Sequence, residues 1–88
     1  MFMRVFYRAR RAGLEGGIGK TFMQIQINGE AREVPDGLSV AALLVHLGLN
    51  PARVAIERNL GILPRAAWEP TIVEAGDRFE IVQFVGGG

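Results

Sequence analysis

The sequence has no cysteine and a single histidine, His46. The absence of cysteine excludes disulfide bonds, thiolate metal ligands and cysteine nucleophiles. Because protein zinc sites are built mainly from cysteine and histidine side chains, one histidine argues against a zinc site as well. His46 lies near the end of a predicted helix, where a histidine usually interacts with the helix dipole rather than acting in catalysis. We therefore predict no metal and no other cofactor.

The sequence also has no apolar run long enough to span a bilayer and no clear signal-peptide core. We therefore expect a cytoplasmic protein with no membrane partner. Its 88 residues allow one small domain, and 49% of them are apolar, which is enough for a core. The net charge of +1 gives no reason to expect nucleic acid as a partner of the folded part.

Basic residues are concentrated near the start of the chain. Residues 1–22 contain one acidic residue against five basic ones, and several glycines interrupt any periodicity; the basic residues are Arg4, Arg8, Arg10, Arg11 and Lys20. We interpret residues 1–22 as a flexible N-terminal extension that adds little to the fold, and residues 23–88 as the domain. Two alternatives are an organelle transit peptide and a nucleic-acid-binding arm.

Local signals predict a hairpin followed by a helix. Residues 24–28 alternate polar and apolar, Asn28-Gly29 is typical of a type I′ turn, and residues 30–34 form the returning strand. Ser39 is suited to cap a helix, and Gly48 is suited to end it. Between them, apolar residues recur at helical spacing and predict one buried stripe: Val40, Leu43, Leu44 and Leu47.

The second half of the chain predicts further strands. Residues 53–58 and 78–85 have strand patterns, residues 62–65 suggest a short edge strand, and residues 66–70 a loop or single helical turn. Trp68 in that loop is expected to cover the core. The predicted fold class is α+β, with one helix on a small mixed sheet and the first and last strands adjacent in its middle.

The last predicted strand is apolar on both faces. Phe79, Ile81, Gln83 and Val85 point one way, and Glu80, Val82 and Phe84 point the other. Val82 and Phe84, with Val85 at the strand end, are therefore candidates for partner binding. The alternative is that the loop around Trp68 or the N-terminal extension covers Val82 and Phe84.

Three glycines, Gly86, Gly87 and Gly88, follow this strand. Glycine has no side chain and adopts most backbone angles, so such a tail can enter a narrow site. From Val85 to Gly88 the extended reach is roughly 13 Å. We expect the α-carboxylate of Gly88 to be the functional group; a frayed end or a linker without function is the alternative.

Five stretches, taken in this order, resemble the ThiS family of sulfur carrier proteins, which has the β-grasp (ubiquitin-like) fold. The stretches are Met23 to Glu30, Leu43-Leu44, Val54 to Asn59, Pro64-Arg65, and Gly76 to Val82 running into the terminal glycines. The resemblance covers residues 23–88. Residues 1–22 depart from it, since members of the family usually begin near Met23.

The resemblance implies a carrier protein rather than an enzyme. An E1-like (ThiF-like) adenylyltransferase would adenylate the Gly88 carboxylate, with Gly87 and Gly86 as the slim arm. Sulfur supplied through a cysteine desulfurase would replace AMP and leave a thiocarboxylate. A thiazole synthase (ThiG-like) would then take up that sulfur during thiamine biosynthesis. Two alternatives are the small subunit of molybdopterin synthase and a ubiquitin-like modifier or interaction module.

Overall fold

The predicted hairpin is confirmed in the computed structural model, which describes residues 2–4 and 21–85. Strands β2 (Phe22–Ile27) and β3 (Glu30–Pro35) pair antiparallel, with Ile27 opposite Glu30. Asn28 and Gly29 have φ angles of 52° and 84°. Both positive values are required by a type I′ turn, which explains why Asn-Gly stands here.

The predicted helix is α1 (Val40–His46), and both predicted caps are present. The Ser39 hydroxyl accepts a hydrogen bond from the Ala42 N–H at 3.0 Å. Gly48 has a φ of 77° and donates its N–H to the Val45 carbonyl, while the Leu49 N–H reaches the Leu44 carbonyl at 2.9 Å. These two bonds form a Schellman motif, so the start and end of α1 are set by its own sequence.

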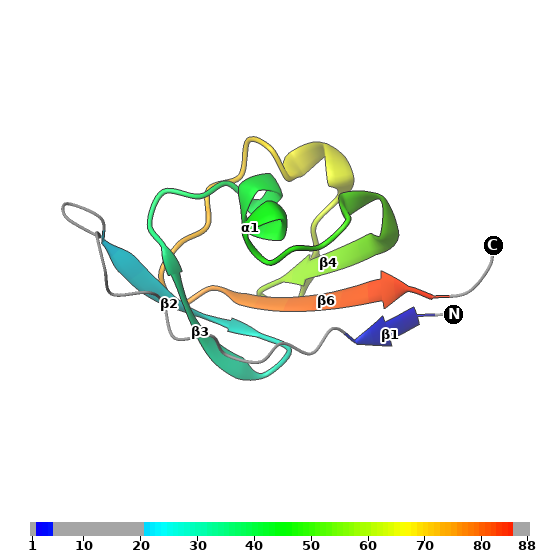
Figure 1. Ribbon diagram of the computed structural model, residues 1–88, viewed down its shortest axis with the longest axis horizontal. Coiled ribbons are helices and arrows are strands. Elements are labelled where there is room, and N and C mark those ends of the chain that lie inside the picture. Colours follow the sequence, from blue (N-terminus) through cyan, green and yellow to red (C-terminus); the bar gives the residue numbers. More distant parts are fainter. Residues whose placement is uncertain (1, 5–20, 86–88) are drawn as a thin grey trace.

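The remaining strands complete a mixed sheet with the order β3-β2-β6-β4-β5. They are β4 (Val54–Arg58), β5 (Gly61–Ile62) and β6 (Arg78–Phe84). β2 and β6 are parallel neighbours in the middle, as predicted, and β4 pairs antiparallel with the other edge of β6. α1 covers one face of the sheet (Figure 1).

Two predicted boundaries in the second half are wrong. The edge strand predicted at residues 62–65 has only two residues, because Pro64 cannot donate to a ladder and the chain instead enters the 3₁₀ helix η2 (Arg65–Ala67). The strand predicted from residue 53 begins at Val54. Asn50 caps the 3₁₀ helix η1 (Pro51–Arg53) immediately before it.

One strand lies inside the segment interpreted as an extension. β1 (Phe2–Arg4) pairs antiparallel with the end of β6, placing Phe2 opposite Phe84 and Arg4 opposite Val82. Figure 1 shows β1 beside the C-terminal end of β6. Three residues are too few to show a periodic pattern, so the sequence did not predict β1. Residues 5–20 lie outside the described residues, and the division of the chain at residue 22 stays a prediction.

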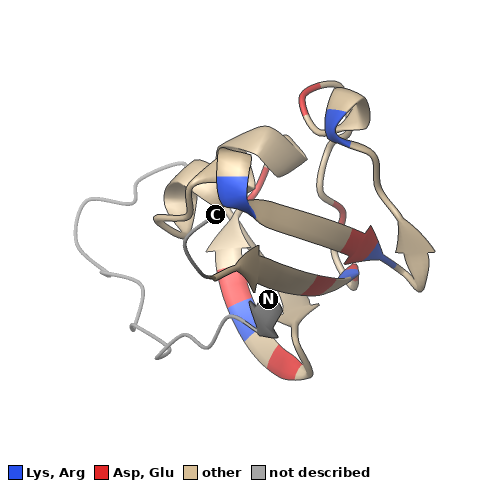
Figure 2. Cartoon of the chain, turned by 90° about the vertical axis from the view of Figure 1, so that its right-hand side faces the viewer, with Lys and Arg blue, Asp and Glu red and all other residues tan. Residues whose placement is uncertain are grey.

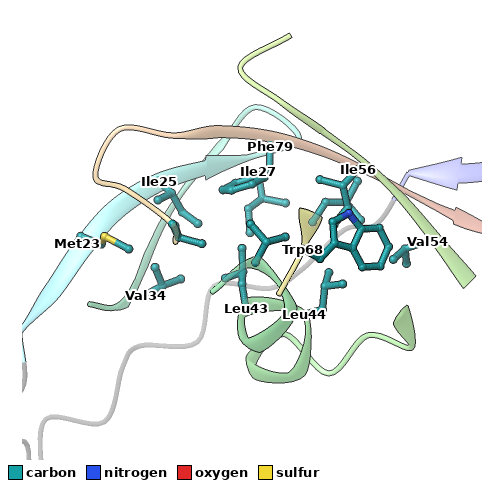
Figure 3. Packing of buried hydrophobic residues seen from close by; sticks show 13 residues of the cluster. Met23, Ile25, Ile27, Val34, Leu43, Leu44, Val54, Ile56, Trp68 and Phe79 are labelled. Atoms are coloured by element: carbon teal, nitrogen blue, oxygen red, sulfur yellow. The ribbon is translucent and has the colours of Figure 1, made fainter. Parts of the chain in front are cut away.

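The core lies between α1 and the sheet. Leu43 and Leu44 of α1 face Phe79 and Ile81 of β6, and all four are at most 1% exposed. Trp68 closes this layer, as expected: it is buried, and its indole N–H donates to the Leu63 carbonyl at 2.9 Å. Figure 3 shows the side chains of Leu43, Leu44, Trp68 and Phe79 meeting between the helix and the strands. The apolar stripe of α1 therefore packs against the apolar face of β6, and together they form the core.

Candidate functional site

The predicted functional end of the chain continues directly from the central strand. β6 pairs with neighbours on both edges, and its last residue is Phe84. Val85 follows and is half-buried. Gly86, Gly87 and Gly88 lie outside the described residues, so their roles stay predictions. The described structure therefore establishes the base from which the glycines depart.

The alternation predicted for β6 is confirmed. Phe79 and Ile81 are buried beneath α1. Glu80 and Val82 on the opposite face are half-buried, and Phe84 is 38% exposed. Trp68 belongs to the core on the helix side and does not cover this outer face. The structure thus brings Val82 and Phe84 to one accessible face, and Val85 lies at the end of the same strand.

A shallow groove of about 490 Å³ lies on this outer face. Its lining combines apolar side chains with two carboxylates and comes from three neighbouring strands: Ala55, Ile56, Glu57, Ile62, Glu80 and Val82. Ile62 is 81% exposed, a large value for an isoleucine. Apolar surface that is open to solvent is typical of a protein-binding surface.

Two acidic residues face each other in this groove. Glu57 of β4 is directly opposite Glu80 of β6. Figure 2 shows acidic positions in red on the strands of the sheet. Like charges directly opposite in neighbouring strands are unfavourable. The two carboxylates give this part of the groove an acidic character.

Of the six residues that line this groove, sequence reasoning proposed only Val82 for partner binding and missed the other five: Ala55, Ile56, Glu57, Ile62 and Glu80. The alternation in residues 54–58 indicates that Ala55 and Glu57 share the face opposite Val54 and Ile56. What the sequence does not give is the register that places Ala55 opposite Val82. The alternation within each strand predicts which residues share a face, but it does not predict which residues of two strands lie opposite each other.

The edge of β6 opposite β4 is occupied by three different groups in succession. β2 pairs with it as far as Phe79. At Ile81 the side chain of Asn28 takes over, since its Oδ1 accepts from the Ile81 N–H at 2.8 Å and its Nδ2 donates to the Ile81 carbonyl at 3.1 Å. β1 follows, with Met3 opposite Gln83. The last described pairing before the tail is therefore made by the N-terminal strand.

The described residues contain no cluster of side chains suited to bind a metal ion. In that part of the chain no three acidic or histidine side chains gather closely enough to hold a metal ion. His46 lies exposed at the end of α1. The described part of the chain also contains no helix of the length and apolarity needed to cross a membrane.

Comparisons with known proteins identify what the chain is similar to. The sequence model of the ThiS family matches residues 25–88. The chain is 46% identical over 66 residues to a thiazole synthase of Paramagnetospirillum magneticum, covering 75% of this chain and 20% of that protein. It is 36% identical to the sulfur carrier protein ThiS of Escherichia coli, covering 75% of this chain and 100% of that protein.

A solved structure shows the same architecture. The crystal structure of the thiamine biosynthesis protein ThiS from Geobacter metallireducens matches with a TM-score of 0.65 and 35% identity, covering 75% of this chain and 100% of that chain. Together with the sheet order, this match confirms the predicted β-grasp fold. The chain spans about a fifth of the length of the two thiazole synthases that it matches. β1 lies outside the residues matched by the family model.

Proposed function

Because the chain belongs to the ThiS family, we propose that it is a sulfur carrier protein of thiamine biosynthesis and that the α-carboxylate of Gly88 is its reactive group. The observation that carries the proposal is the course of β6. This strand leaves the core at Ile81, ends at Phe84, and is followed by Val85 and three glycines. A well-packed strand gives the tail a fixed base, and glycines give it the narrow shape needed to enter a partner's active site.

The chemistry follows from the weakness of a carboxylate as an acyl donor. An E1-like adenylyltransferase would use ATP to turn the Gly88 carboxylate into an acyl adenylate, whose AMP is a good leaving group. The persulfide formed by a cysteine desulfurase would then attack the acyl adenylate and displace AMP, giving an acyl disulfide. A thiol such as excess cysteine would reduce its S–S bond and leave the thiocarboxylate on Gly88. The carrier in this scheme is a co-substrate, and the acids, bases and metal ions belong to its partners.

Val82, Phe84 and Val85 are proposed to contact these partners. Val82 and Phe84 lie on the outer face, directly before the tail. The groove beside them extends this surface over β4 and β5 to Ile62. An activating enzyme that binds the tail must also approach the end of β6, so this surface is in reach of the same partner.

The comparisons support thiazole synthase as the acceptor of the sulfur. A protein named thiazole synthase contains, within a fifth of its length, a segment 46% identical to this chain. A carrier segment within the same polypeptide as its acceptor has a high effective concentration at the acceptor site. This favours the thiamine pathway over molybdopterin synthesis for the present chain.

The test is the intact mass of the protein after incubation with ATP, a ThiF-like adenylyltransferase, a cysteine desulfurase and cysteine. The expected result is a mass increase matching the exchange of one oxygen for sulfur, located at Gly88 by fragmentation. A chain lacking Gly88 should fold and remain unmodified. Retained adenylation of that shortened chain, or an unchanged mass of the intact chain with active partners, contradicts the proposal and favours a modifier or interaction module.

A further inference from the structure

The N-terminal strand occupies a particular place on the sheet. On the edge of β6 that carries β2, the Phe79 carbonyl accepts from the Asn28 N–H at 2.8 Å, and the Ile81 backbone is bonded to the Asn28 side chain. Since the N–H and C=O of alternate strand residues point to the same edge, those of Gln83 point there as well. Met3 of β1 is the residue opposite Gln83. β1 thus covers the last stretch of this edge before the tail.

Without β1, this stretch would be an open strand edge. The ThiS-family part of the chain supplies partners for Phe79 and Ile81 through β2 and Asn28. Among the described residues, this part of the chain supplies no backbone partner for Gln83 on the same edge. The residue opposite Gln83 there is Met3, which lies outside the residues matched by the family model. An unpaired row of N–H and C=O groups is a ready site for an added strand.

We propose that the edge of β6 at Gln83 is a docking site for an extended backbone segment of the activating partner, and that β1 is its intramolecular competitor. The proposal rests on the proposed function, because it assumes that a partner approaches the tail. β1 shows that an antiparallel strand fits this edge. A partner segment in the same place would lie one residue from Phe84 and two from Val85, where it would hold the base of the tail.

A partner strand could displace β1 because the pairing between β1 and β6 is short. The three residues of β1 provide one pair, Met3 with Gln83, whose backbone groups face each other. Because β1 belongs to the same chain as β6, its pairing is intramolecular and competes with a partner strand through an effective concentration. A partner strand can bind only the molecules in which β1 has left this edge. The apparent affinity of the partner is therefore the intrinsic affinity multiplied by the fraction of molecules with an open edge.

The experiment uses the full chain and a single proline. Met3→Pro removes the N–H that faces Gln83, whereas Phe2→Pro removes an N–H that points away from β6 and serves as the matched control. Exchange of the Gln83 amide, measured by NMR, reports whether β1 is paired in each variant. Binding of a ThiF-like adenylyltransferase without ATP is measured by calorimetry.

We expect exchange of the Gln83 amide to be about 3- to 30-fold slower in the unmodified chain and in Phe2→Pro than in Met3→Pro. We expect Met3→Pro to bind the adenylyltransferase about 3- to 30-fold more tightly, corresponding to an open fraction of about 3–30% in the unmodified chain. In the complex, the Gln83 amide of Met3→Pro should become protected again. An unprotected Gln83 in the unmodified chain, unchanged or weaker binding of Met3→Pro, or an equal gain in Phe2→Pro overturns the proposal.

This result is separable from the proposed function. Binding and Gln83 exchange are measured without ATP, whereas the function is tested by the mass change at Gly88. A modified Gly88 with no effect of Met3→Pro refutes the docking site alone. A tighter Met3→Pro complex without modification of Gly88 refutes the sulfur-carrier function alone.

Discussion

The carboxylate of Asp77 connects two stretches that are distant in sequence and adjacent in the sheet. It accepts hydrogen bonds from the Arg58 guanidinium at 2.8 and 3.0 Å, from the Asn59 side chain at 3.2 Å and from the Glu74 N–H at 2.8 Å. Asp77 is only 5% exposed. Because β6 begins at the next residue, this network fixes where the central strand starts and how it meets β4.

Replacing Asp77 by alanine should destabilise the fold strongly. Arg58 would lose its ion-pair partner, and the Glu74 N–H would lose its acceptor. For a pair that is partly shielded from water we expect a loss of about 2–4 kcal/mol in the free energy of unfolding. The measurement is urea denaturation. Glu33→Ala, which removes an exposed carboxylate from β3, should cost less than about 0.5 kcal/mol; equal losses would show that Asp77 acts only through net charge.

Phe84 and Phe22 provide a matched pair for testing the partner surface. They are 38% and 39% exposed, and each lies on the outer face at one end of its strand. Phe84 adjoins the tail, whereas β2 begins at the far end of the sheet (Figure 1). The two substitutions to glutamate should therefore have similar effects on stability and different effects on binding.

We expect Phe84→Glu to weaken binding of a ThiF-like adenylyltransferase at least about tenfold, because it places a charge where an apolar contact is proposed. Phe22→Glu should leave binding unchanged. Calorimetric titration gives the affinities, and thermal unfolding shows whether each variant is folded. A collapse in the melting temperature of Phe84→Glu alone would instead place Phe84 in the core.

Whole elements were predictable where their signals are local. The type I′ turn at Asn28-Gly29, the Ser39 cap and the Gly48 terminus each depend on one or two residues, and all three are confirmed. The groove was predicted only in part, since Val82 was identified but its neighbour Ala55 was not. Cross-strand neighbours depend on register, which is set by the packing of the whole sheet.

Asn28 shows how one residue can serve two elements. Its backbone forms the hairpin turn, which the sequence predicted, while its side chain bonds the Ile81 backbone, which the sequence did not indicate. This second role links the β2–β3 hairpin to the C-terminal half of β6. It also marks the point at which β2 stops covering the edge of β6 and β1 begins.

Asn28→Gly should separate these two roles. Glycine accepts the positive φ of the turn but cannot bond Ile81, so we expect a loss of about 1–3 kcal/mol in stability. We also expect faster amide exchange at Ile81, with Gln26 and Phe79 less affected. Asn50→Gly, which removes the cap of η1, is the control and should leave Ile81 exchange unchanged. Preserved protection of Ile81 in Asn28→Gly would contradict the role assigned to this side chain.

In the molecule as a whole, the parts that hold the fold are separate from those proposed to act. Among residues 21–85, the thirteen buried apolar residues all lie between Met23 and Ile81. β1 and the tail-bearing end of β6 meet outside that range. This separation lets the end of β6 bind partners at little cost to the core.

A chain beginning at Met23 should therefore fold on its own. It retains every residue of the buried apolar cluster and loses residues 1–22, including β1, the exposed Phe22 and the two hydrogen bonds between Thr21 and Asp36. Because the losses are one short pairing and two hydrogen bonds at the exposed start of β2, we expect the free energy of unfolding to fall by no more than about 2 kcal/mol. Urea denaturation should remain cooperative, with an unchanged slope after correction for chain length. An unfolded product would move the domain boundary to the N-terminal side of residue 23 and make β1 part of the fold rather than a cover for its edge.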